Sequence, residues 1–221
     1  MTHWVVLSGG LDSTCALALV LVGHDKAYVR TVSFNYGQRH RKEVDAAKRV
    51  SDHVGVDHEV RYIGGTLHGS ALLSDVEVPH GHYAASTMTQ TVVQGRNLLF
   101  AASAVALTDP GDTIYFGVHA GDHPVYPDCR PDFWHDLGEA VAGAYEVLIE
   151  TPFITKSKAD LLGIGVGVGA PVGLTWSCYE GGEQHCGRCG TCVERAEAFY
   201  LAGIPDPTFY DDPDYWRQAV R

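Results

Sequence analysis

The stretch Leu7-Ser8-Gly9-Gly10-Leu11-Asp12-Ser13-Thr14 follows the apolar run Trp4-Val5-Val6 near the amino end of the chain. An apolar strand therefore leads into two glycines and then into hydroxyl-bearing residues that open a helix-like segment. Glycines let a backbone approach an anion closely, and the amide groups of the turn and of the helix N-terminus point towards it. The stretch predicts a phosphate-binding loop at the first turn between a strand and a helix.

This loop is not of the Walker A type, because no Gly-Lys-Ser/Thr follows the glycines at the required spacing. Residues 8–13 instead resemble the Ser-Gly-Gly-x-Asp-Ser signature of the PP-loop ATP pyrophosphatases. The resemblance implies that residues 7–14 bind ATP, which is split between its α- and β-phosphates to leave AMP on an oxygen of the substrate. An ordinary Gly-Gly turn with a Ser or Asp helix cap is the competing interpretation.

The composition limits the class of protein. The chain has 221 residues, 45% of them hydrophobic, which suits one α/β domain over residues 1–221. Its net charge of −11 argues against a broad nucleic-acid interface, so we expect small-molecule substrates and no nucleic-acid partner. No signal pattern opens the sequence, and no apolar run approaches the roughly 20 residues that span a bilayer. We therefore expect a cytoplasmic protein without a membrane partner.

Strand-like and helix-like segments alternate along the chain. Strands are predicted at residues 4–7, 27–34, 59–63 and 113–118. Helices are predicted at residues 14–22, 41–54, 98–107, 133–148 and 193–201, with a long polar loop over 64–93. A helix that starts at 157 is expected to stop at the alternating glycines of 163–169. This order predicts an α/β fold with a doubly wound, mostly parallel sheet that binds its ligands at the carboxyl ends of the strands.

Four of the six cysteines crowd together with the spacing Cys178-x7-Cys186-x2-Cys189-x2-Cys192. Four thiolates suit a closed tetrahedral zinc site, and the intervening glycines allow tight turns around the metal. A closed site leaves no open coordination position, so this zinc knuckle over 178–192 is expected to be structural. An iron–sulfur cluster, a site in which His185 replaces one cysteine, and free thiols are the alternatives.

Further blocks extend the family resemblance along the chain. They are residues 33–41 (SFNYGQRHR), 95–100 (GRNLLF), 126–130 (YPDCR), 150–152 (ETP) and 178–179 (CY). With the PP-loop before them and the four cysteines after them, the chain resembles the 7-cyano-7-deazaguanine (preQ0) synthase family, QueC, over about residues 4–200.

That family converts 7-carboxy-7-deazaguanine and ammonia into the nitrile preQ0 through adenylated intermediates. The resemblance implies an ATP-dependent C–N ligase of queuosine- or archaeosine-type biosynthesis. It also implies a PP-loop fold, of the adenine nucleotide alpha hydrolase type, with one structural Zn²⁺ in the cysteine knuckle. ATP and Mg²⁺ are expected as substrate and activator, and a homodimer is expected as the assembly.

Basic residues are the candidates for the phosphate end of such a site. Arg39 or Arg96 would add positive charge as pyrophosphate leaves, although Arg39 also belongs to a surface cluster of basic residues. Asn97 follows Arg96 at a helix start, where capping is the alternative role. Lys156 and the nearby Lys158 would face the pyrophosphate, with a solvated helix start as the competing interpretation.

The segment 122–130 supplies the candidates for the base end of the site. Asp128 would accept the N–H groups of a guanine-like edge, and Arg130 would pair with the substrate carboxylate. Tyr126 or Trp134 would stack on the ring, and a Pro-Asp turn with core aromatics is the competing interpretation. Asp122 follows the fourth predicted strand, where a ligand-facing position is expected.

The sequence is compatible with three other functions. One is a PP-loop enzyme that modifies tRNA, of the thiolase or lysidine synthase type, against which the net charge of −11 argues. Another is a relative within the same family that transfers the deazaguanine to another acceptor. The third is a nucleotide sensor that keeps the loop without catalysis.

Overall fold

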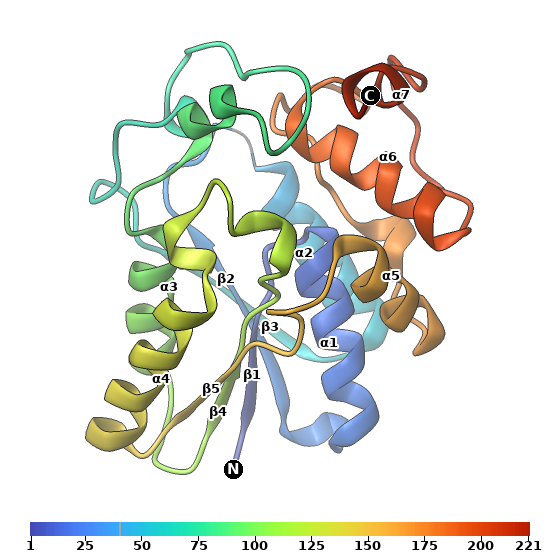
Figure 1. Cartoon of the computed structure of the whole chain (residues 1–221). Helices are drawn as coiled ribbons and strands as arrows, with labels where there is room; N and C mark the ends of the chain where they lie inside the picture. The colour runs from blue at the N-terminus through green and yellow to red at the C-terminus, as the bar shows by residue number, and fades with distance from the viewer. Residues whose placement is uncertain (40) are drawn as a thin grey trace.

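A parallel sheet between two layers of helices forms the centre of the computed structural model, which describes residues 1–39 and 41–221 (Figure 1). Within those residues the sheet has the order β3-β2-β1-β4-β5, and every neighbouring pair is parallel. The strands are β1 (His3–Val6), β2 (Val29–Asn35), β3 (Asp57–Tyr62), β4 (Thr113–Tyr115) and β5 (Leu148–Glu150). The predicted doubly wound parallel sheet is confirmed.

Helices cover both faces of this sheet. They are α1 (Leu11–Gly23), α2 (Lys42–Val54), α3 (Arg96–Val105), α4 (Pro131–Tyr145), α5 (Lys158–Gly167), α6 (Gly190–Ala202) and α7 (Trp216–Ala219). Helices α3 and α4 lie on one side of the sheet, whereas α5 and α6 stack beyond α1 on the other (Figure 1). In the part of the chain that the structure describes, no helix is long and apolar enough to cross a membrane.

Strand β1 is buried on both faces, in agreement with the apolar run over residues 4–7. Val5 and Leu7 point to one face and pack with side chains of α1 and α2. Trp4 and Val6 point to the other face and join the core beneath α3 and α4. Because successive side chains of a strand alternate between faces, one short strand anchors both helix layers.

The carboxyl ends of β1 and β4 diverge at the point where the winding of the sheet reverses. The chain leaves β1 for α1 and β2 on one side, while β4 pairs with β1 on the other. Open α/β sheets bind their ligands at such a point. A Cβ atom on Gly117 would lie 2.7 Å from the amide nitrogen of Ser13, so the segment after β4 packs against α1 only because glycine stands there.

Some predicted boundaries were wrong. The helix predicted over 133–148 ends at Tyr145, where Glu146 adopts a left-handed conformation with φ of 56°. The chain then forms β5, which pairs with β4, so sheet pairing overrides the local helical pattern. Strand β4 itself ends at Tyr115 rather than at 118, and the long loop over 64–93 contains two short 3₁₀ segments.

The glycines of 163–169 do not stop helix α5, which runs to Gly167. Gly165 is buried, and a Cβ atom there would lie 2.3 Å from the sulfur of Cys15 on α1. The missing side chain therefore allows α5 to pack closely on α1, and this burial compensates for the low helix propensity of glycine. Cys15 is fully buried in this contact.

We expect Gly165→Ala to lower the free energy of unfolding by about 1–2 kcal/mol, because overpacking against Cys15 outweighs the gain in helix propensity. Gly163→Ala is the matched control on the same helix, where an added Cβ meets nothing within 4 Å. That variant should be as stable as the parent or more stable by up to about 1 kcal/mol. Urea denaturation measures both, and equal stability of the two variants would contradict the packing argument.

Candidate active site and metal centre

The predicted phosphate loop lies at the carboxyl end of β1 and is held by its own hydroxyl groups. Ser13 Oγ accepts the Ser8 N–H (3.2 Å) and lies 3.0 Å from Ser8 Oγ. Gly10 is the N-cap residue of α1, and no side chain of the described residues accepts a hydrogen bond from the first N–H groups of the helix. These N–H groups are therefore available to an anion. Open N–H groups beside a glycine turn are what the predicted phosphate-binding loop requires.

Gly9 brings the loop into backbone contact with helix α2. Its φ is +87°, and a Cβ atom there would lie 2.0 Å from the carbonyl oxygen of Glu43. The carbonyl of Gly9 also accepts the N–H of Trp176 at 2.9 Å. The loop is therefore fixed between α2 and the segment that leads to the cysteine knuckle.

A cluster of charged side chains lies beside the loop around Lys158. Its Nζ donates to Glu194 Oε2 (2.8 Å) and to Asp12 Oδ2 (3.1 Å), and both contacts are largely buried. Burial alone would lower the pKa of Lys158, but the two carboxylates outweigh it and raise the pKa, so the ammonium stays charged. The Lys158 ammonium therefore lies charged beside the predicted phosphate loop, with carboxylates around it.

His119 lies fully buried at the base of this cluster. Its Nδ1 accepts the N–H of Gly121 (3.1 Å), and its Nε2 lies 3.3 Å from Lys158 Nζ. That nitrogen lies 3.6 Å from Asp122 Oδ2 and 3.7 Å from Glu194 Oε1. Burial raises the pKa of Asp122, against the opposing effect of His119.

The loop and the charged side chains around Lys158 line one half of a pocket, and the other half of this pocket has an aromatic lining. The aromatic residues that line the pocket are Phe34, Tyr36, Tyr83, Phe100, Phe116, Tyr126, Trp176 and Tyr179. Two charged residues, Arg96 and Glu43, join the part of this lining formed by the tyrosines at 36, 126 and 179. Burial raises the pKa of Glu43 to about 7, although Arg96 opposes the shift.

The structure separates the candidate residues into two groups. Arg96, Asn97, Asp122 and Tyr126 line the pocket together with the loop. The other four candidates are outside that lining: Arg39, Asp128, Arg130 and Lys156.

Each residue of the second group has a local role or faces solvent. Arg39 is exposed and donates to the carbonyl of Val76 (2.9 Å), and Arg130 is exposed and donates to that of His123 (3.1 Å). Asp128 accepts the backbone N–H of Asn97 (3.0 Å) and so holds the start of α3. Lys156 is exposed, whereas Lys158, two residues later, is the lysine that faces the loop.

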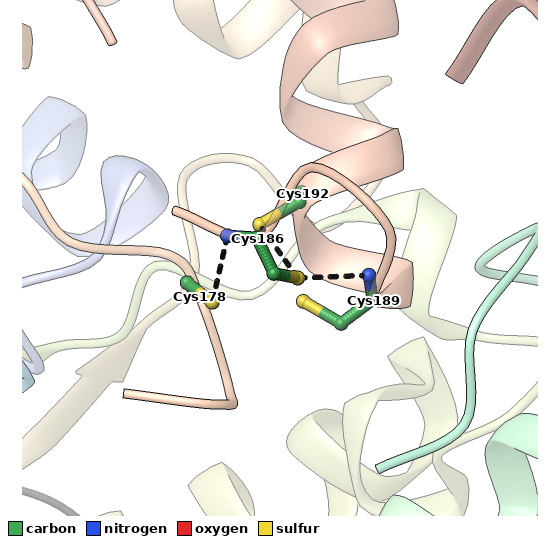
Figure 2. Close-up of side chains that lie close together, drawn as sticks. All are labelled: Cys178, Cys186, Cys189 and Cys192. Atoms are coloured by element: carbon green, nitrogen blue, oxygen red, sulfur yellow. Dashed lines mark hydrogen bonds between the residues drawn. The ribbon is translucent and has the colours of Figure 1, made fainter. Parts of the chain in front are cut away.

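The four cysteines of the predicted metal site come together in one cluster (Figure 2). Their sulfur atoms all lie within 4.8 Å of one another, and all four side chains are buried. Backbone N–H groups of Cys186 and Cys189 donate to sulfur atoms of Cys178 and Cys186, respectively (3.4 and 3.3 Å). Such donors stabilise thiolates, so the cluster suits a metal ion such as zinc.

His185 does not belong to this group of sulfur atoms. Its Nε2 accepts the N–H of Ser177 (3.1 Å), and its ring packs on Trp176.

The C-terminal segment packs closely on the cysteine knuckle. A Cβ atom on Gly187 would lie 2.1 Å from the carbonyl of Asp212.

Comparison with known proteins identifies the family. A family model described as "Queuosine biosynthesis protein QueC" matches residues 2–203. The chain belongs to this family. A 7-cyano-7-deazaguanine synthase of Brucella anthropi is 48% identical over 229 residues, covering 100% of this chain and 98% of that protein. The Rhizobium rhizogenes protein of the same name is 49% identical over 225 residues, covering 98% and 94%. Among solved structures, NMN synthetase from Francisella tularensis reaches a TM-score of only 0.47 at 12% identity, covering 98% of this chain and 84% of that one.

Sequence reasoning did not single out two acidic residues that this QueC-family chain places in the pocket, Glu43 and Glu194. Each lies close to a segment that was recognised, since Glu43 opens the helix after β2 and Glu194 follows Cys192 by two residues. An acidic residue in the first turn of a helix at the carboxyl edge of a parallel sheet was the signal available for Glu43. Glu194 offered none, because its contact with Lys158 spans 36 residues.

We expect Cys189→Ser to remove the metal and to lower the stability by about 3–4 kcal/mol, the free energy that a ligand at 100 to 1,000 times its Kd contributes to a fold. Metal content by mass spectrometry and thermal denaturation measure the two effects. Cys129→Ser is the control, since Cys129 is buried but lies outside the cluster. Parent protein that is brown, or that holds no zinc, would contradict the zinc assignment.

Proposed function

We propose that this chain uses ATP and ammonia to convert 7-carboxy-7-deazaguanine into 7-cyano-7-deazaguanine, the compound for which its relatives are named. One observation carries the proposal. A single pocket joins a phosphate-binding loop with a charged cluster to an aromatic wall with Arg96 and Glu43. A polyphosphate and a flat, polar aromatic acid fit these two halves side by side.

The loop residues 7–14 and Lys158 are proposed to hold the phosphates of ATP. The amide groups at the start of α1 and the ammonium of Lys158 face the same space. Three carboxylates, Asp12, Asp122 and Glu194, surround this lysine. Among the described residues, no hydrogen-bond partner reaches the buried Oδ1 of Asp12.

This surplus of carboxylate oxygens fits Mg²⁺, which prefers oxygen ligands and is bound in such sites with substrate phosphates. Asp12, Asp122 and Glu194 are the residues that would hold it. The ion would supply charge neutralisation for the phosphates, which this loop without a Walker lysine provides only in part. The cysteine knuckle fits Zn²⁺ in a structural role, because its four thiolates would leave no open position.

Neither a carboxylate oxygen nor an amide oxygen leaves readily in water, and transfer of AMP makes each a leaving group. In the first round the substrate carboxylate attacks the α-phosphorus of ATP, and pyrophosphate departs. Ammonia then attacks the carboxyl carbon, AMP leaves with the oxygen, and nitrogen loses a proton to give the amide. In the second round the amide oxygen takes AMP from a second ATP. Loss of that AMP and of the remaining N–H protons gives the nitrile.

The wider setting of the reaction is proposed on more general grounds. We infer one domain over residues 1–221, a homodimer, and a cytoplasmic location. The cysteines within the described residues are free of disulfides, in keeping with a reducing compartment.

The direct test is product analysis by mass spectrometry after incubation with ATP, ammonium and 7-carboxy-7-deazaguanine. We expect the nitrile, with AMP and pyrophosphate formed at two equivalents of each per nitrile. Oxygen-18 in the substrate carboxyl group should appear in AMP, because the carboxyl oxygen leaves bound to phosphorus. ADP and phosphate as the nucleotide products, or no label in AMP, would refute the proposed chemistry.

A lysine pair on either side of Ser157 tests the assignment of the phosphate end. We expect Lys158→Ala to lower kcat/KM for ATP by about 100-fold, because it removes a buried positive charge from the site of charge development. Lys156→Ala should change this value less than about threefold, the range expected for an exposed charge that is screened by solvent. Steady-state kinetics with ATP as the varied substrate gives both numbers. Equal losses in the two variants would refute the assignment.

A further inference from the structure

Glu43 and Arg96 place opposite charges on the same aromatic wall of the pocket. A carboxylate repels both the phosphates of ATP and a carboxyl group of the substrate, so Glu43 is unsuited to binding either. The acceptor positions of its carboxylate are unfilled, since among the described residues no hydrogen bond reaches it. A half-buried carboxylate with open acceptor sites favours a ligand that brings N–H donors.

We propose that Glu43 recognises the guanine-type edge of the substrate. Its two oxygens would accept the ring N1–H and the exocyclic amino group, which lie side by side on the six-membered ring. Arg96 carries donors that suit the adjacent O6 acceptor. The pair thus presents acceptor, acceptor and donor to an edge that offers donor, donor and acceptor. This inference rests on the function proposed above and adds the specificity-determining residue.

The position of Glu43 relative to the loop supports this assignment. Its backbone carbonyl faces the hydrogen of Gly9, so Glu43 is fixed directly against the phosphate cradle. Its carboxyl group interacts electrostatically with Arg96, Tyr36 and Tyr179, which line the same pocket. The amino-bearing edge of a 7-deazaguanine lies opposite the position that carries the carboxyl group. Holding that edge at Glu43 therefore leaves the carboxyl group free to meet the α-phosphate.

The acidic residue that the sequence offered for this role, Asp128, is already engaged elsewhere. Its Oδ2 accepts the Asn97 N–H at 3.0 Å, and its backbone carbonyl accepts the side-chain amide of Asn97 at 3.1 Å. Asp128 is also absent from the lining of the pocket, whereas Glu43 belongs to it. Edge recognition therefore belongs to Glu43, with Asp128 holding the start of α3.

The test compares two substrates, 7-carboxy-7-deazaguanine and its analogue without the exocyclic amino group. The parent enzyme should prefer the first by about 10- to 100-fold in kcat/KM, the discrimination of a bidentate contact. Glu43→Gln replaces one acceptor by an NH₂ donor. It should lower kcat/KM for the guanine-type substrate by about 10- to 100-fold and remove most of the preference. The KM for ATP should change less than about threefold, because the phosphates bind elsewhere.

Asp128→Asn is the matched control, and its preference between the two substrates should equal that of the parent. The inference is overturned if Glu43→Gln keeps the preference, if Asp128→Asn loses it, or if the parent enzyme uses both substrates equally. The last outcome is measured on the parent enzyme, so the proposal can be refuted even if Glu43→Gln does not fold. A parent enzyme that forms no nitrile from either substrate refutes the proposed function itself, which separates the two failures.

Discussion

The backbone contact at Gly9 is the constraint on which the site depends. The φ of +87° and the 2.0 Å separation between a Cβ atom and the Glu43 carbonyl exclude every side chain at this position. The Gly9 carbonyl meanwhile accepts the Trp176 N–H. Three segments distant in sequence therefore meet at one residue: the loop after β1, the first turn of α2 and the approach to the cysteine knuckle. This contact therefore fixes the loop, in one half of the pocket, against Glu43 and Trp176 in the other half.

The charged cluster beside the loop shows why burial and charge can coexist here. Removing a lysine from water is unfavourable unless carboxylates surround it. Lys158 has two such partners in hydrogen-bond contact, Asp12 and Glu194, and a third carboxylate, Asp122, nearby. The carboxyl groups outnumber the single lysine, and the buried Oδ1 of Asp12 has no hydrogen-bond partner among the described residues, so the cluster has oxygen atoms that the lysine does not fill. Those oxygens would suit a cation and the lysine would suit a phosphate, which is the pairing that the proposed metal–nucleotide complex requires.

The parts of the molecule that the sequence predicted are those encoded locally. The loop, the cysteine knuckle and the alternation of strands and helices each depend on residues within a short stretch. Strand β5 was missed because its pairing with β4 joins residues 35 apart, as Ile114 and Ile149 show. Glu194 was missed for the same reason. The choice between Lys156 and Lys158 was available locally, since Ser157 and Asp160 form a capping box. That box places Lys158 in the first turn of α5 and Lys156 outside the helix.

The cysteine knuckle influences the pocket although its thiols are buried away from substrate. Tyr179 follows Cys178 directly, and Glu194 lies two residues after Cys192 at the start of α6. Both line the pocket, one in the aromatic half and one in the charged half. Thr191, between Cys189 and Cys192, donates its hydroxyl to the Ser177 carbonyl at 2.7 Å, which closes the knuckle onto the segment joined to Gly9. A metal that fixes the four sulfur atoms therefore also fixes a wall of the pocket, and its structural role and the geometry of the site cannot be separated.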